Sequence, residues 1–170
     1  CNGCQLMIHL LKDINWLELP EKQNIVMLKN KSGRFESRFS TLKVTNNNDV
    51  FFKNMKNTCF GMWVAHGEGQ FQMNGETLSF LKKNNMISLQ YVDADDADDA
   101  DDADDDADDV VKYPKYPHNP NGSIENIAGI ASKDGRHVVM MPHPERSFLK
   151  WQIPWLSKDV DETLKNTDYT

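Results

Sequence analysis

The sequence predicts a single soluble α/β domain, and two patterns lead to that fold class. From Gln5 to Ile14, apolar residues recur at the spacing of an amphipathic helix. After Pro20 the pattern changes to short runs of β-branched and aromatic residues with turn signals between them, which is typical of strands. The chain of 170 residues is long enough for one domain with a buried core.

The predicted elements follow one another along the chain. We expect strands over residues 24–28, 34–39, 59–65 and 86–92, and a short helix over 78–83 that ends in two lysines and an Asn-Asn pair. Proline and turn residues predict an irregular loop over 113–122. The clearest hairpin pairs residues 126–132 with 137–141 across an Asp-Gly turn.

The net charge of −7 comes from one segment, residues 93–109, which holds 12 aspartates and 5 alanines. Without these aspartates the chain would carry +5, so the acidity does not describe the surface of the fold. Because the run has nothing to bury, we expect a disordered insertion that interrupts the domain. A calcium site is the alternative, but the run lacks the turn glycine of calcium loops.

The sequence also bears on the cellular compartment. No apolar run approaches the roughly 18 to 20 residues that cross a bilayer, and the start has no signal-peptide pattern. The cysteines, Cys1, Cys4 and Cys59, are odd in number and too few to staple a secreted fold. We therefore expect a cytoplasmic protein.

The first residue, Cys1, is a candidate nucleophile. A thiol beside a helix N-terminus meets the positive end of the helix dipole, which favours the reactive thiolate. Gly3 fits the tight turn that exposes such a nucleophile. The base would be His143 and the residue that orients it Glu145, because positions i and i+2 of an extended segment face the same side. We expect Pro142 and Pro144 to keep that segment extended.

Together these motifs resemble a known family. CNGCQ, NKSGRFESRF, HGEG, YPHNPNGS and GIASKDGRHVVMMPHPERS are similar, in the same order, to the glutamine amidotransferase domain at the C-terminus of phosphoribosylformylglycinamidine synthases. The resemblance extends from Cys1 to about residue 156. It implies a class I, flavodoxin-like three-layer α/β domain, here without its first strands and helices, and a polar tail over 157–170.

The resemblance also implies the roles of individual residues. Cys1 corresponds to the nucleophile, His143 to the general base and then acid, and Glu145 to the orienting carboxylate. The backbone N–H of Asn2 would donate to the oxyanion. The remaining substrate-binding positions implied by the resemblance are Gln5, Phe35, Arg38 and His66.

The substrate implied by the resemblance is L-glutamine, whose ammonia would pass to a synthase domain on an N-terminal part of the same chain. ATP and Mg²⁺ would act in that part, because these 170 residues show no phosphate loop or metal cluster. The family's elbow has residues before the cysteine, so we expect a fragment of a longer polypeptide whose activity in isolation is doubtful.

Three other interpretations are open. A processed N-terminal cysteine could use its own α-amine as the base, but then the His-Pro-Glu motif would be unexplained. Cys1 and Cys4 could form half of a zinc site, although the second ligand pair is missing and Cys4 fits a buried helix position. The domain could also be a non-catalytic scaffold. Trp151 and Trp155, near the end, are expected to pack against the domain.

Overall fold

The computed structural model describes residues 2–21, 24–46, 49–93, 95 and 114–156. Cys1, the predicted tail and almost all of the predicted insertion lie outside the described residues. The elements, in chain order, are α1 (Asn2–His9), η1 (Leu10–Lys12), β1 (Ile25–Leu28), β2 (Glu36–Val44), β3 (Cys59–His66), β4 (Gln70–Met73), α2 (Gly75–Lys83), β5 (Ile87–Tyr91), η3 (Ile124–Asn126), β6 (Ile127–Ala131), β7 (Val138–Met140), η4 (Pro144–Arg146) and η5 (Lys150–Gln152), where η marks a 3-10 helix.

The two helices, the four strands and the hairpin predicted from the sequence are confirmed, with different ends. The sequence patterns missed β4, which has only four residues. The helix α2 starts earlier than predicted because Asn74 caps it: the Asn74 side chain accepts a hydrogen bond from the backbone N–H of Thr77 at 2.8 Å.

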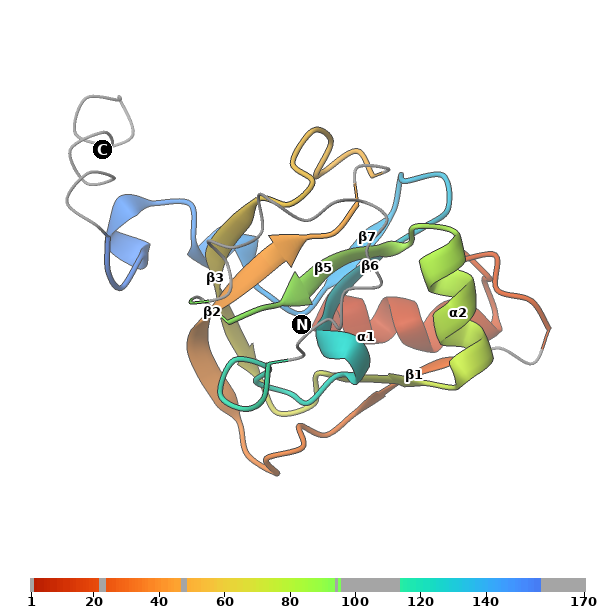
Figure 1. Cartoon of the computed structure of the whole chain (residues 1–170). Helices are drawn as coiled ribbons and strands as arrows, with labels where there is room; N and C mark the ends of the chain where they lie inside the picture. Colours follow the sequence, from red (N-terminus) through yellow and green to blue (C-terminus); the bar gives the residue numbers. More distant parts are fainter. Residues whose placement is uncertain (1, 22–23, 47–48, 94, 96–113, 157–170) are drawn as a thin grey trace.

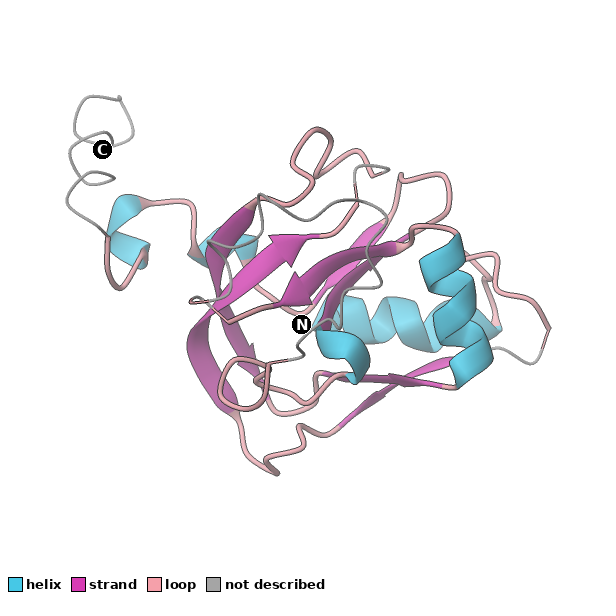
Figure 2. Cartoon of the chain, viewed as in Figure 1, coloured by secondary structure: helices cyan, strands magenta, loops and turns pink. Residues whose placement is uncertain are grey.

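The described strands form a five-stranded sheet in the order β3-β2-β5-β6-β7 and a two-stranded sheet of β1 and β4. The pairings among these strands are antiparallel. Figure 1 shows that the larger sheet is strongly curled, and Figure 2 shows α1 and α2 gathered toward one end of the molecule. The fold is therefore an α/β domain with a curled antiparallel sheet.

Two apolar clusters hold these elements together. The first joins both α-helices, the small sheet and β5–β7; its buried members include Ile8, Phe71, Leu81, Ile130 and Met141. The second lies among β2, β3 and β5, and includes Leu42, Val64 and Tyr91. Because β5 contributes to both clusters, the two packed regions share one sheet. Among the described residues, no helix has the length and apolar character needed to cross a bilayer.

The described residues on either side of the acid-rich segment lie at neighbouring points of the fold. On one flank, the backbone N–H of Val92 donates to the carbonyl of Thr41 at 3.1 Å. On the other flank, His118 Nε2 lies 3.4 Å from Asp93 Oδ2. The two described flanks of the segment therefore lie side by side.

Candidate active site

His143 lies where the two edges of the large sheet approach each other. The chain leaves β7, an edge strand, and the backbone N–H of His143 donates to the carbonyl of Trp63 on β3, the other edge strand, at 2.8 Å. The Trp63 N–H in turn donates to Ser147 Oγ at 3.1 Å. The backbone that carries the imidazole is thus held by a bridge between residues 80 positions apart in sequence.

The side chain of Glu145 holds the imidazole of His143, with 2.5 Å between His143 Nδ1 and Glu145 Oε1. The expectation that this segment stays extended is wrong, because residues 144–146 form a 3-10 turn with Pro144 in its first position. Pro144 has the φ that such a turn needs, and lacks the N–H that the turn would leave unpaired. The turn brings the carboxylate back toward the ring.

The electrostatics of this pair fit a base and its orienting partner. Burial opposes the ionised form of Glu145, but the hydrogen bond from His143 and the charges of His143 and Arg146 outweigh it, so the pKa of Glu145 is lowered. The other ring nitrogen, His143 Nε2, is buried and has no hydrogen-bond partner among the described residues. It is the nitrogen left to exchange a proton with a nucleophile or a substrate.

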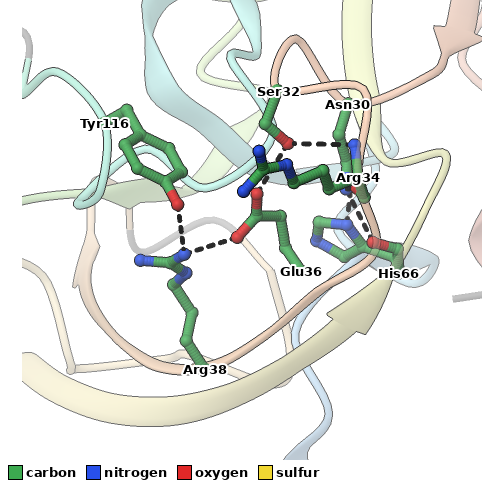
Figure 3. Close-up of polar contacts among 7 residues, drawn as sticks. All are labelled: Asn30, Ser32, Arg34, Glu36, Arg38, His66 and Tyr116. Atoms are coloured by element: carbon green, nitrogen blue, oxygen red, sulfur yellow. Dashed lines mark hydrogen bonds and ion pairs between the residues drawn. The ribbon is translucent and has the colours of Figure 1, made fainter.

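A second imidazole, His66, lies fully buried at the end of β3. Its Nδ1 is 3.0 Å from Asn30 Oδ1, while Asn30 Nδ2 donates to the carbonyls of His66 at 2.6 Å and Arg34 at 2.9 Å (Figure 3). Burial, and secondarily the charge of His143, lower the pKa of His66 to about 4. His66 is therefore neutral near pH 7 and close enough to His143 to feel its charge.

Beside His66 lies a nearly buried carboxylate, Glu36, which is its register partner on β2 and only 4% exposed. It accepts hydrogen bonds from Ser32 Oγ at 2.6 Å and from Arg38 Nη2 at 2.5 Å, and Arg38 also donates to the Tyr116 hydroxyl at 2.9 Å (Figure 3). Burial opposes ionisation, but these two hydrogen bonds and the Arg38 charge lower the pKa of Glu36. The carboxylate is thus paired with Arg38 rather than with His66.

The first turn of α1 meets the same region. Gln5 Nε2 donates to the carbonyl of Glu68, two residues after His66. Cys4, on the same turn, is 4% exposed, and burial raises the pKa of its thiol to about 12. Cys4 is therefore an unreactive core residue, as the sequence predicted for a buried helix position. A groove of about 700 Å³ runs from this contact along α1 and β1, but neither His66 nor His143 lines it.

The structure brings some predicted site residues together and leaves others apart. His143 and Glu145 are in contact, while His66, Arg38 and Gln5 surround the end of β3. Phe35 is 67% exposed, and Asn2 is exposed at the start of α1. Cys1 lies outside the described residues. Within the described part of the chain, no group of three His, Cys, Asp or Glu side chains could hold a metal ion.

Local sequence patterns do not indicate the partners that fix these side chains. These partners are Asn30, Ser32 and Glu36, which belong to the NKSGRFESRF motif, and Tyr116, which begins the YPHNPNGS motif. The signal that could have found them is the position of Glu36 in its strand, where it shares the alternation of Leu42 and Val44, because a carboxylate on the buried face of a strand needs partners.

The predicted packing of Trp151 and Trp155 against the domain is wrong. Their side chains are 79% and 77% exposed. The segment is tied down instead by its backbone, since the indole Nε1 of Trp63 donates to the carbonyl of Gln152 at 2.6 Å. This contact holds the backbone at Gln152, while the side chains of Trp151 and Trp155 remain in solvent.

A buried histidine held by a carboxylate is part of the arrangement expected of a triad-type amidotransferase. The chain belongs to the CobB/CobQ-like glutamine amidotransferase domain family, whose sequence model matches residues 1–169. This assigns the chain to a family of enzyme domains that use glutamine.

Individual proteins similar to this chain carry the name phosphoribosylformylglycinamidine synthase. The protein of that name from Drosophila melanogaster is 41% identical over 164 residues, which is 95% of this chain. The one from Dictyostelium discoideum is 36% identical over 169 residues, or 99% of this chain. The chain spans only 11% of the length of each of these relatives.

A solved structure shows the same fold. The structure titled PurLQS from Thermotoga maritima matches with a TM-score of 0.53 and 23% identity, over 94% of this chain and 57% of that one. The two folds are therefore alike.

Proposed function

We propose that this chain is the glutaminase part of a phosphoribosylformylglycinamidine synthase. It would hydrolyse L-glutamine and supply ammonia for the ATP-dependent conversion of formylglycinamide ribonucleotide to formylglycinamidine ribonucleotide in purine biosynthesis. One observation carries this proposal: His143 is held at Nδ1 by Glu145 and has a buried Nε2 without a partner among the described residues. Relatives named for this synthase support the particular reaction.

In the proposed reaction, Cys1 attacks the side-chain carbonyl of glutamine. The Sγ–C bond forms, the C–N bond breaks, and the thiol proton passes through His143 Nε2 to the departing nitrogen as ammonia. His143 then activates a water that hydrolyses the thioester to glutamate. Glu145 keeps the ring oriented and stabilises its charged form, and the backbone N–H of Asn2 donates to the oxyanion.

The other substrate contacts belong to the same proposal. Gln5, Phe35, Arg38 and His66 would surround the bound glutamine. Arg38 has a buried Nε–H without a partner among the described residues, which suits a carboxylate oxygen of an amino acid. Phe35, with most of its side chain exposed, would form the rim.

The rest of the enzyme is also proposed. ATP and Mg²⁺ would bind the synthase portion outside this chain, and the ammonia would pass to that portion. The complete amidotransferase domain would have the flavodoxin-like three-layer arrangement, and the enzyme would act in the cytoplasm. These proposals rest on the resemblance of the motifs and on the relatives.

The test uses full-length protein and a glutamine-analogue affinity label that alkylates the nucleophile. We expect one adduct, on Cys1, and loss of glutamine-dependent turnover in Cys1→Ser with turnover on ammonium salts retained. Cys59→Ser is the matched control and should keep both activities. An adduct on Cys4 or Cys59, or no adduct together with full ammonium-dependent turnover, would mean that the domain is a scaffold or uses another nucleophile.

A further inference from the structure

The protonation state of His66 follows from its neighbour Asn30. Asn30 Nδ2 donates to the backbone carbonyls of His66 and Arg34, which can only accept. The amide oxygen of Asn30 must therefore face the ring, and His66 Nδ1 must carry the hydrogen that it accepts at 3.0 Å. In a neutral ring this leaves Nε2 without a hydrogen, as a hydrogen-bond acceptor.

The backbone around His66 keeps the ring in this position. A Cβ atom added to Gly69 would lie 2.8 Å from His66 Nδ1, so the ring packs directly against the glycine. The carbonyl of Gly67 accepts a hydrogen bond from the N–H of Asn30 at 2.9 Å. Both glycines of the HGEG motif thus have a structural role, which is to hold His66 against Asn30.

The acceptor nitrogen of His66 needs a ligand. His66 is fully buried, and its Nε2 has no hydrogen-bond partner among the described residues. A buried polar atom without a partner costs about 1–3 kcal/mol, so such atoms are rare unless a ligand satisfies them. The second unpartnered imidazole nitrogen nearby is Nε2 of His143, whose charge acts on His66.

The proposed reaction supplies a donor for this position. When His143 gives a proton to the departing nitrogen, that nitrogen must lie within hydrogen-bond reach of His143 Nε2. It also carries two hydrogens of its own, which need acceptors because the histidines that surround it are buried. We propose that His66 binds the substrate by accepting a hydrogen bond, through Nε2, from the carboxamide nitrogen of glutamine. This inference rests on the proposed function.

The neutral ring also has a consequence for the product. Ammonia is useful to a synthase only while its lone pair is free, and an imidazolium beside it would protonate it. His66 carries no hydrogen on Nε2 and so cannot give one. Burial, which lowers the pKa of His66 to about 4, keeps the ring in this form across the physiological range.

The test compares two substrates in full-length protein: glutamine, and the γ-methyl ester of glutamate, whose departing methanol has no N–H. In His66→Phe we expect kcat/KM for glutamine to fall about tenfold to hundredfold, and that for the ester to change less than about twofold. His66→Gln, which again offers an acceptor, should recover part of the loss. His137→Gln is the control, because His137 is exposed on the β6–β7 hairpin.

An equal loss with both substrates would overturn the inference, because it would place His66 at the α-amino group or in a purely structural role. No loss with either substrate would overturn it as well. If His66→Phe does not fold, Asn30→Ala, which releases the ring, should show the same preference for the ester. Wild-type protein that hydrolyses neither substrate would contradict the proposed function itself.

Discussion

The two buried histidines of this domain differ in the partner that each Nδ1 meets. At His143 the partner is the carboxylate of Glu145, 2.5 Å away, and at His66 it is the amide oxygen of Asn30, 3.0 Å away. Each ring leaves a buried Nε2 without a partner in the described part of the chain. Both rings are therefore held at Nδ1 and open at Nε2, but only His143 has a negative charge beside it.

This difference sets what each ring can do. A carboxylate stabilises an imidazolium, so His143 can take up a proton and give it back. An amide dipole offers no such charge, and burial then favours the neutral ring, so Nε2 of His66 can only accept a hydrogen bond while its Nδ1 donates to Asn30. Two histidines close to one another can thus serve as a base and as a fixed acceptor because their neighbours differ by one functional group.

The largest expected effect comes from removing that difference. Glu145→Gln gives His143 the kind of partner that His66 has, and we expect kcat for glutamine hydrolysis to fall about a hundredfold to a thousandfold. Turnover with ammonium salts should stay unchanged in the full-length enzyme. Glu76→Gln, an exposed change on α2, is the control. A loss below about threefold would show that the carboxylate does not support the base.

An intermediate effect concerns pH and stability. Since burial lowers the pKa of His66 from 6.5 to about 4, the unfolded chain binds this proton first as the pH falls. The contribution of His66 to the free energy of unfolding is fully present above pH 6.5. It is lost progressively as the pH falls toward 4, by about 3 kcal/mol in total. Urea unfolding at several pH values measures it.

The difference between wild type and His66→Gln isolates this one group. Below pH 6.5 the two unfolding free energies should converge, while His137→Gln should follow the wild type. Parallel curves for wild type and His66→Gln would mean that His66 takes up its proton as readily in the folded protein as in the unfolded chain, and the contrast between the two histidines would be lost.

The smallest effect concerns the pairing that keeps Glu36 away from His66. Tyr116→Phe removes the hydroxyl that accepts from Arg38 but keeps the ring, whose centroid lies 4.8 Å from the guanidinium carbon. We expect a loss of about 0.5–1 kcal/mol in the free energy of unfolding, because the bond is partly exposed. The pH dependence should keep its wild-type shape. If the acid-induced loss of unfolding free energy began at a higher pH than in the wild type, Arg38 would no longer neutralise Glu36.

Local patterns in the sequence were sufficient for most of the fold. The hairpin of β6 and β7 has an Asp-Gly turn, and α1 has helical spacing of its apolar residues, so both could be predicted. The strand β4 could not, because four residues give too short an alternation. The curl of the sheet, with His143 bonded to Trp63, depends on contacts distant in sequence.

The site could be predicted in part for the same reason. His143 and Glu145 are two residues apart, so their contact was expected, although a turn and not an extended segment makes it. His66 could be predicted as a substrate-binding residue only from the resemblance to a known family. Its pairing with Asn30 joins residues 36 positions apart, and no periodicity in the sequence announces such a pair.

The neighbouring flanks of the acid-rich segment have a consequence for how this domain can vary. Since Asp93 and His118 lie against each other, the fold already brings together two described positions on either side of the acid-rich segment. The entropy of closing a flexible loop rises only with the logarithm of its length, about 0.6 kcal/mol for each doubling. A change in the number of Asp and Ala residues between these two positions is therefore expected to cost the sheet that carries both histidines little stability.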